Sequence, residues 1–524
     1  MKRLLPLVRP FSLAFLFCLL SAHSQASQVK VTGGIVEGEA SPDGEVLSFK
    51  GIPYAAPPVG DLRWKRPQPV RPWQGVRDAT KFGPRAMQKR IWDDMFFYDE
   101  GPSEDCLYLN VWSPAAPQGK KLPVMFWIHG GGFFAGGTSE PRQNGHQLAR
   151  KEVIVVSVGY RMGIFGFMAH PELTEESAVG ASGNYGLLDM VAALEWVQEN
   201  IAAFGGDPGN VTIFGESAGS WAVSSLMATP LSEGLFHKAI AQSGAVLSPW
   251  RQPPSRLEAE ATAVGFLEEH FGGATLESLR ELPADKLIDV FWAEGLGKFS
   301  VCEDGYFFPK SPSEIFARGE QRPVPLVVGW NLDESGPEGF LRGAPATPEG
   351  FQARAKEEFG ERADAFLEVY AAATPEEVKR AAADYAGDRF IGFGTWKLAE
   401  EHARTSGAPV YRYRFDQLLP LPEGARADAQ ARAAHSWEIE YVFDVIDSKD
   451  LPWRSEDYEV ARLMSSYWTQ FAKTGDPNAE GLPRWPAYAA ENDKPVLHID
   501  ESPELQLDTH RSRYEFLETL PVDL

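Results

Sequence analysis

Ser217 lies in the pentapeptide Gly215-Glu216-Ser217-Ala218-Gly219, and a serine in this setting can act as a nucleophile. The short apolar run 211–214 before it predicts a buried strand, and 218–227 can form a helix. A sharp turn between strand and helix exposes the serine hydroxyl. The flanking glycines are needed there because a Cβ would collide with neighbouring backbone. The pattern therefore predicts a nucleophilic serine rather than an ordinary glycine-serine turn.

A second glycine-rich segment has the composition to stabilise the negative charge that forms when a serine attacks a carbonyl. The sequence His129-Gly130-Gly131-Gly132-Phe133 follows the apolar run 124–128, which predicts a buried strand. Successive glycines leave backbone N–H groups uncovered, so that they can donate hydrogen bonds to an oxyanion. We expect this hole to be formed by the N–H groups of Gly131, Gly132 and Ala218. A flexible glycine turn is the alternative, and His129 is expected to brace the loop.

A serine hydroxyl needs a general base, and the base needs a carboxylate to orient it. With a serine in a strand–turn–helix elbow, the acid and then the histidine follow it in the chain. The apolar run 324–329 predicts a strand that leads into Asp333 and Glu334, and order alone does not choose between these two. The later histidines are His402, His435, His498 and His510. Order favours His435, in a loop after the alternating strand 410–415, without deciding the matter.

Several longer blocks surround these residues in a fixed order: 49–55, 57–60, 104–111, 200–208, 329–334, 435–439 and 471–478. Together they resemble the type-B carboxylesterases, the family that includes the cholinesterases, from near Val29 almost to the C-terminus. The resemblance implies an α/β-hydrolase fold, in which a single large domain has a central, mostly parallel sheet flanked by helices. It also implies that the catalytic triad is Ser217, Glu334 and His435.

Two further residues take expected roles from the same resemblance. Ser243, in Gln242-Ser243-Gly244, is expected to support the triad from behind, and a simple turn serine is the alternative. Glu216 stands directly before the nucleophile. It is either held by hydrogen bonds beneath the elbow or, like the matching glutamate of the cholinesterases, holds water and charge near the serine.

Aromatic residues close to these motifs are expected to line the substrate site: Trp92, Phe133, Trp221 and Trp437. Packing in the core is the alternative for each of them. If two or more reach the site, its acyl side is narrow and aromatic. Short acyl chains, from acetyl to about hexanoyl, are then expected to react faster than long ones.

The composition and the spacing of the motifs favour one catalytic domain, 27–524. The 524 residues contain no glycine-serine linker, no long low-complexity run and no repeat. The predicted catalytic elements span 129–435, so a domain boundary inside this range would split the site. The hydrophobic content of 44% and the charged content of 23% are those of an ordinary globular protein.

The N-terminus has the three parts of a secretory signal peptide, residues 1–26. Lys2, Arg3 and Arg9 precede the apolar run 11–20, and small and polar residues follow as far as Ala26. The apolar run is short for crossing a bilayer, so an uncleaved anchor is the less favoured alternative. We therefore expect a secreted or periplasmic protein with no stable membrane anchor.

Only three cysteines occur, and Cys18 leaves with the expected signal peptide. Related enzymes commonly pair the cysteine at the position of Cys106 with one about twenty residues upstream, but the segment 83–88 holds no cysteine. Two isolated buried thiols, Cys106 and Cys302, are favoured over a bridge between them. A chain of this size does not need disulfides to bury a stable core.

The formal net charge of −23 becomes −26 without residues 1–26, which hold three basic and no acidic residues. Binding to nucleic acid is disfavoured, because phosphate contacts require clustered lysine and arginine. Long-range steering favours neutral or cationic substrates, although a local arginine pocket could override it. No metal-binding spacing occurs, and no cofactor is expected.

These observations predict a secreted serine carboxylesterase that acts on a small-molecule ester through an acyl-enzyme. The same triad could instead cleave amides, thioesters or polyesters. Some cholinesterase-like proteins are adhesion modules without catalysis, but they have typically lost a triad member, whereas all three are present here.

Overall fold

A computed structural model describes residues 27–115, 119–422, 424–425, 432–488 and 494–521. The strands are β1 (Ser27–Val31), β2 (Gly34–Ala40), β3 (Val46–Pro53), β4 (Val76–Asp78), β5 (Arg85–Ala86), β6 (Pro102–Ser103), β7 (Tyr108–Pro114), β8 (Leu122–Ile128), β9 (Ile154–Val158), β10 (Gly206–Glu216), β11 (Lys238–Gln242), β12 (Leu326–Asn331), β13 (Val410–Phe415), β14 (Pro495–Ile499) and β15 (Glu504–Leu507). The expected signal peptide, residues 1–26, lies outside the described residues.

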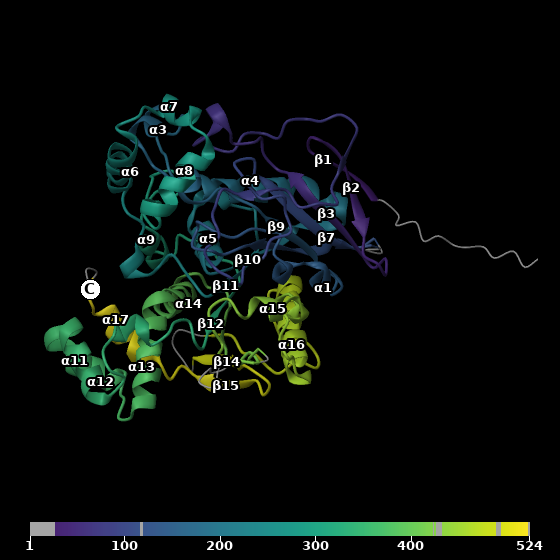
Figure 1. Cartoon of the computed structure of the whole chain (residues 1–524). Coiled ribbons are helices and arrows are strands. Elements are labelled where there is room, and N and C mark those ends of the chain that lie inside the picture. Colours follow the sequence, from purple (N-terminus) through teal and green to yellow (C-terminus); the bar gives the residue numbers. More distant parts are fainter. Residues whose placement is uncertain (1–26, 116–118, 423, 426–431, 489–493, 522–524) are drawn as a thin grey trace, which may run out of the picture.

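The helices cover both faces of the sheet and build two outlying groups (Figure 1). They are α1 (His146–Ala149), α2 (Gly163–Phe167), α3 (Pro171–Glu176), α4 (Tyr185–Asn200), α5 (Ala218–Ala228), α6 (Arg256–Phe271), α7 (Leu276–Glu281), α8 (Ala284–Val290), α9 (Pro312–Ala317), α10 (Glu338–Leu341), α11 (Pro348–Phe359), α12 (Ala363–Val369), α13 (Pro375–Gly387), α14 (Phe393–Thr405), α15 (Ile439–Val442), α16 (Ser455–Thr474) and α17 (Arg511–Glu518).

One large sheet organises the described part of the chain, in the order β1-β2-β3-β7-β9-β8-β10-β11-β12-β13-β14-β15, with β4 beside β2. The strands from β9 to β14 pair in parallel, whereas β1, β2, β3 and β7 form an antiparallel edge. The expected α/β-hydrolase architecture, with a mostly parallel central sheet in one domain, is thus confirmed.

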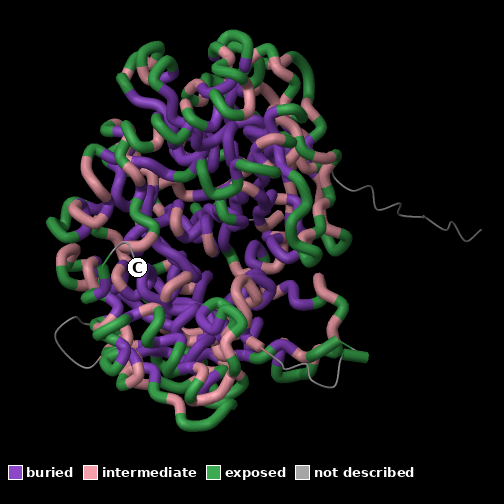
Figure 2. Tube along the Cα trace, turned by 60° about the vertical axis from the view of Figure 1, so that its left-hand side comes forward, coloured by how far each residue is buried: buried purple, intermediate pink, exposed green. Residues whose placement is uncertain are grey.

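The central strands are apolar along their length because helices cover them on both sides. Every residue of β8, β9 and β11 is buried. Successive side chains point to opposite faces, so Ile213 packs in the core that includes α4 and α5, while Phe214 packs in the core that includes α16. Figure 2 shows these buried segments running through the middle of the molecule. The site residues at the ends of the strands therefore stand on a rigid base.

A third core lies outside these two layers and joins α11, α12, α13 and α17. It forms the lower left part of the molecule in Figure 1, whereas α6 to α9 lie at the upper left. The helix α13 passes through a π-helical turn, Asp388–Gly392, directly into α14. Such turns insert one extra residue and often mark functional sites.

Two expectations about the whole chain can be examined on the described residues. Cys106 and Cys302 are both free and buried, which agrees with two isolated thiols rather than a bridge. No described helix combines the length and the apolar character that a bilayer span requires.

Candidate active site

Ser217 lies in the turn between β10 and α5 with φ 55° and ψ −120°, a backbone conformation that side chains rarely adopt. The two glycines of the pentapeptide make the turn possible. A Cβ on Gly219 would lie 2.0 Å from the carbonyl oxygen of Ile128, and one on Gly215 would lie 2.6 Å from the carbonyl carbon of Gly219. The N–H of Ser217 donates to the carbonyl of Gln242 at 2.9 Å, which ties the turn to β11.

The three side chains of the expected triad form a continuous chain of hydrogen bonds. Nε2 of His435 is 2.9 Å from Oγ of Ser217, and Nδ1 is 2.5 Å from Oε2 of Glu334. Glu334 follows the end of β12 and is buried, whereas His435 comes from a loop about a hundred positions later. The fold therefore brings together Ser217, His435 and Glu334, although sequence order alone had not decided which acid and which histidine accompany the serine.

Glu334 is held in place from behind through its other oxygen. The hydroxyl of Ser243 donates to Oε1 at 2.7 Å, and the backbone N–H of Asn331 donates to the same oxygen at 2.6 Å. Two donors on one oxygen fix the plane of the carboxylate. Ser243 thus has the contact that was expected of it.

Asp333, the other acid left open by chain order, points away from His435. Its carboxylate accepts from Nη1 of Arg380 at 2.6 Å and from the N–H of Ala433 at 3.1 Å. Its own N–H donates to the carbonyl of Ala433 at 2.9 Å. Asp333 therefore fastens the segment that leads into His435 but does not contact the imidazole.

The glycine loop after β8 lies against the elbow. A Cβ on Gly130 would lie 3.1 Å from Cβ of Ser217, and one on Gly131 would lie 2.0 Å from the carbonyl oxygen of Ala135. Gly131 and Gly132 have φ values of 103° and 64°, which glycine adopts without strain. Within the described residues, the N–H groups of Gly131, Gly132 and Ala218 donate to no protein acceptor. Three uncovered donors beside the serine suit a developing oxyanion.

His129 braces this loop. Its ring stacks on Tyr160 at 4.5 Å, and the hydroxyl of Tyr160 donates to the carbonyl of His129 at 2.8 Å. Burial lowers the pKa of His129 to about 4, so the ring is neutral at physiological pH.

Glu216 contacts His435 directly. Its Oε1 lies 3.2 Å from Nε2 of His435, and within the described residues no hydrogen bond satisfies this buried oxygen. Burial raises the pKa of Glu216, although the positive charge of His435 acts in the opposite direction and lowers it. Burial alone would lower the pKa of His435, but Glu216 and Glu334 outweigh it and raise this pKa. The two carboxylates therefore favour the imidazolium.

A buried polar group that sequence reasoning missed supports the histidine loop. Glu438 accepts from Nε2 of Gln242 at 3.0 Å and from Nδ2 of Asn331 at 2.7 Å. The indole of Trp468 donates to Gln242 at 3.0 Å. Glu438 lies in the block 435–439, so its position was marked, but its partners come from strand ends that only the fold brings near.

The aromatic residues expected to line the site divide into two pairs. Trp92 stacks at 5.7 Å on Phe134, whose ring lies against Gly132, and Trp221 lies beside Gly244 near the carbonyl of Ser217. Phe133, by contrast, is 6% exposed and packs on Phe167 at 4.9 Å.

Trp437 packs against the core that includes α16, with Nζ of Lys449 5.6 Å from its ring. Phe133 is buried in packing contacts, which corrects the expectation that it lines the site, whereas Trp437 is half-buried and its role stays a prediction. A narrow acyl side then depends on Trp92, Trp221 and Trp437.

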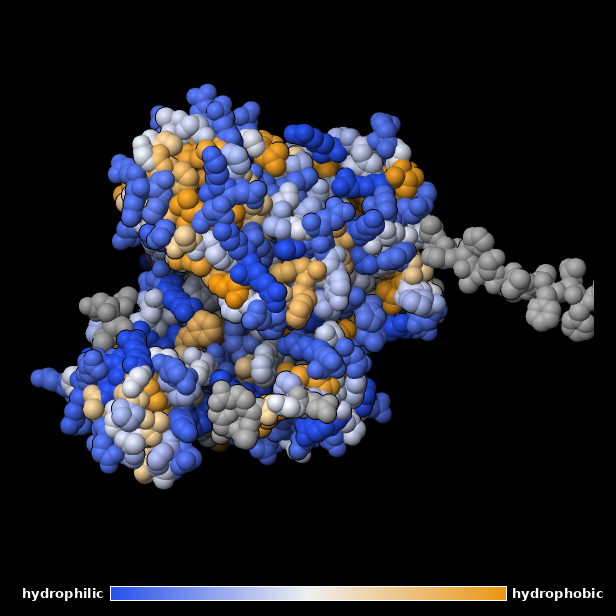
Figure 3. Space-filling model, in the orientation of Figure 1, coloured by the Kyte–Doolittle hydropathy of each residue, from blue (hydrophilic) through white to orange (hydrophobic). Residues whose placement is uncertain are grey.

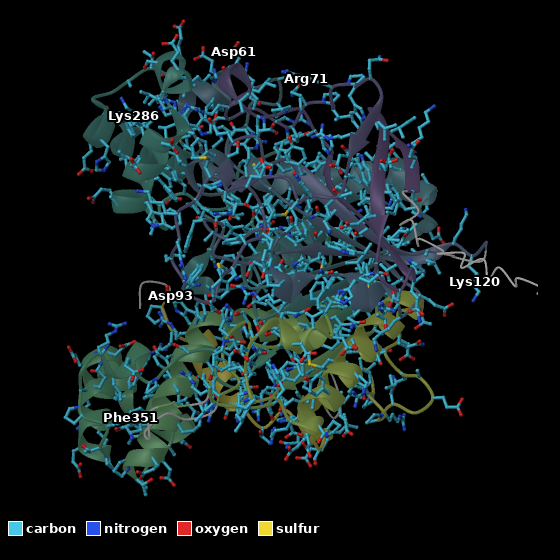
Figure 4. The ribbon with its side chains drawn as sticks, turned by 45° about the vertical axis from the view of Figure 1, so that its right-hand side comes forward. Asp61, Arg71, Asp93, Lys120, Lys286 and Phe351 are labelled. Carbon is cyan, nitrogen blue, oxygen red and sulfur yellow. The ribbon has the colours of Figure 1, made fainter. Side chains whose placement is uncertain are left out.

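The surface of the molecule is recessed between two of its parts. Figure 3 shows this hollow between the part that carries α6 to α9 and the part that carries α11 to α13. Figure 4 places Asp93, the neighbour of Trp92, at this boundary, and Phe351 within the lower part.

The fold and the site together define an α/β-hydrolase with an esterase-like centre. The carboxylesterase family matches residues 25–517, and the chain belongs to that family. It is a carboxylic ester hydrolase, because its relatives across most of its length are esterases.

Three relatives illustrate the match. A fumonisin B1 esterase of Sphingopyxis macrogoltabida is 38% identical over 87% of this chain and 83% of its own. A medium-chain fatty acyl-CoA hydrolase precursor of Anas platyrhynchos is 36% identical over 86% and 84%. A solved PNB esterase superposes with a TM-score of 0.79 at 33% identity, over 95% of this chain and all of its own.

Replacing Glu216 with glutamine is expected to lower the pKa of His435, because it removes a negative charge next to the imidazolium. His435 then stays neutral down to a lower pH. The acidic limb of the pH profile of kcat/KM therefore shifts to lower pH by about one unit. Titration of isotope-labelled histidine by NMR, together with the activity profile, measures both effects.

Glu172→Gln is the matched control, because it removes an exposed carboxylate from α3. It should leave the profile unchanged. An unchanged or raised pKa of His435 in the Glu216 variant would contradict the electrostatic argument.

Proposed function

We propose that the protein is a secreted serine carboxylesterase that acts through an acyl-enzyme on Ser217. The observation that carries the proposal is the unbroken chain of hydrogen bonds from Ser217 through His435 to Glu334, beside three uncovered N–H groups. A nucleophile, a base with its orienting acid, and an oxyanion hole are the parts that acyl transfer requires.

In the first half of the reaction, Nε2 of His435 takes the proton of Ser217 while Oγ attacks the ester carbonyl. The carbonyl oxygen becomes an oxyanion that accepts from Gly131, Gly132 and Ala218. When this tetrahedral intermediate collapses, the bond to the alkoxy group breaks. The imidazolium gives its proton to the departing alcohol, which leaves an ester between the acyl group and Ser217.

In the second half, water takes the place of the alcohol. His435 removes a proton from water as it attacks the acyl carbonyl, and the same N–H groups hold the second oxyanion. Collapse breaks the bond to Oγ of Ser217, which recovers its proton from His435, and the carboxylic acid leaves. Glu334 orients the imidazole and stabilises the imidazolium in both halves.

Other acyl substrates remain alternatives on the same triad. One relative is named for fatty acyl-CoA, which is a thioester, and its similarity supports testing thioesters beside oxygen esters and amides. An adhesion module without catalysis has no support from this geometry, because the nucleophile, base and acid are hydrogen-bonded to one another.

Ser217→Ala is expected to lower kcat by roughly 10⁴–10⁶-fold, because the covalent route disappears and only binding and the oxyanion hole remain. Hydrolysis of p-nitrophenyl acetate measures the loss. A fluorophosphonate probe should label wild-type protein at Ser217, as located by peptide mass spectrometry. More than a few per cent of residual activity, or labelling at another residue, would refute the assignment.

The adjacent acids provide a matched pair of variants. Glu334→Gln should lower kcat by roughly 10³–10⁴-fold, since a neutral amide cannot stabilise the imidazolium of His435. Asp333→Asn should keep most of the activity and instead lower the Tm, because it removes the ion pair with Arg380. Kinetics and thermal melts of both proteins separate these roles. Equal loss of kcat in two folded variants would leave the acid unassigned.

The proposal includes export by the segment 1–26. Its basic start, apolar centre and small-residue end are those of a signal peptide. Expression of the full chain in a bacterial host should yield mature protein that begins near Ser27, in the periplasm or the medium. Active enzyme that stays on the membrane and retains Met1 to Ala26 in mass spectrometry would show an anchor instead.

A further inference from the structure

The donors of the glycine loop are aimed by the carbonyl groups of the residues that precede them. A trans peptide is planar, so the C=O of one residue and the N–H of the next point in opposite directions. The carbonyl of Gly131 accepts from the N–H of Ala135 at 2.9 Å. The carbonyl of Gly130 accepts from Nδ1 of His129 at 2.9 Å. The N–H groups of Gly132 and Gly131 therefore face the opposite side of the loop from these two bonds.

The end of the loop packs directly against its beginning. Gly136 is buried, with φ 112°. A Cβ on Gly136 would lie 2.5 Å from the carbonyl oxygen of Gly130 and 2.6 Å from Nδ1 of His129. This is the bond that orients the peptide carrying the N–H of Gly131. Because close-packed groups transmit a displacement, a shift of Gly136 would turn this peptide as well.

Gln88 holds both peptide groups of Gly136 at once. Its Oε1 accepts from the N–H of Gly136 at 2.9 Å, and its Nε2 donates to the carbonyl of Gly136 at 2.6 Å. Nε2 also donates to the carbonyl of Ala86 at 3.1 Å. Two residues paired in an antiparallel sheet exchange their bonds in the same way. A reversed amide would set donor against donor and acceptor against acceptor, so the side chain has one orientation here.

The segment that carries Gln88 is itself held in place. Gln88 is 7% exposed and follows β5, which pairs with β6. Arg85 forms an ion pair with Asp99, whose other oxygen accepts from the hydroxyl of Ser139 at 2.5 Å. The segment 85–88 is therefore fastened to the region of the glycine loop at two points, one at Gly136 and one at Ser139.

We propose that Gln88 is a positioning residue of the oxyanion hole. It acts through the backbone of Gly136, which keeps the peptides of Gly130 and Gly131 turned so that the next N–H groups are free to meet an oxyanion. Without Gln88, a buried N–H and a buried C=O of Gly136 lose these partners, and the loop must move to satisfy them. This inference rests on the proposed hydrolysis at Ser217.

A matched pair of esters reports on the oxyanion hole alone. The esters are p-nitrophenyl acetate and p-nitrophenyl thionoacetate, in which sulfur replaces the carbonyl oxygen. Both need the same nucleophile and base, but sulfur accepts hydrogen bonds weakly and gains little from the hole. Release of p-nitrophenolate gives kcat/KM for each ester, and the ratio of oxygen ester to thiono ester is the readout. Inactive protein cancels from this ratio, because both esters are measured on one preparation.

Gln88→Met fills a similar volume but removes both bonds to Gly136. Losing one oxyanion donor outright lowers kcat by roughly 10²–10³-fold. A displaced loop retains part of that stabilisation, so the ratio is expected to fall about tenfold. Gln88→Asn keeps an amide on a shorter stem that cannot reach both groups of Gly136. It should lower the ratio in the same direction at less risk to folding.

A trifluoromethyl ketone provides a second measurement. Oγ of Ser217 adds to the ketone carbonyl, the serine proton passes to His435, and the adduct carries an oxyanion in the hole. Its inhibition constant should rise about tenfold in Gln88→Met. Gln68→Met is the matched control, since Gln68 is an exposed glutamine whose Nε2 donates to the carbonyl of Arg66 at 2.9 Å. It should leave the ratio and the inhibition constant unchanged.

An unchanged ratio in both Gln88 variants would overturn the proposal, even if both esters react more slowly, because the role of Gln88 would then be structural only. An equal fall of the ratio in Gln68→Met would overturn it as well. Failure of the proposed function looks different. In that case wild-type protein would not hydrolyse the oxygen ester, or hydrolysis and inhibition by the ketone would survive Ser217→Ala.

Discussion

The left-handed backbone of Ser217 is the constraint on which the rest of the site depends. A non-glycine residue in such a conformation costs about 1–3 kcal/mol, so its surroundings must hold it there. The parallel pairing of β10 with β11 does so through the bond from Ser217 N–H to Gln242, and Gly215 and Gly219 remove the side chains that would block the turn. The same turn places the first N–H of α5 beside the hydroxyl, where the positive end of the helix dipole also lies.

Negative charge concentrated around one imidazole is the second feature of the site. Glu334 and Glu216 both contact His435, and Glu438 lies behind them with Gln242 and Asn331. In the proposed mechanism these carboxylates stabilise the imidazolium that forms during each proton transfer, but they also raise the pKa of the resting histidine. The hydrogen bonds to Glu334 and Glu438 keep the groups in place before the substrate arrives, which is the form of electrostatic stabilisation that is most effective in catalysis.

Sequence reasoning succeeded where a local pattern dictates the geometry. The glycines around Ser217 and in 130–132 are required by close backbone contacts, so their spacing predicted both turns. Chain order could not separate Asp333 from Glu334, because adjacent residues in a turn point in different directions and only the fold shows which one reaches His435. For the same reason the burial of Phe133 was missed, since the direction of a side chain depends on contacts with distant segments.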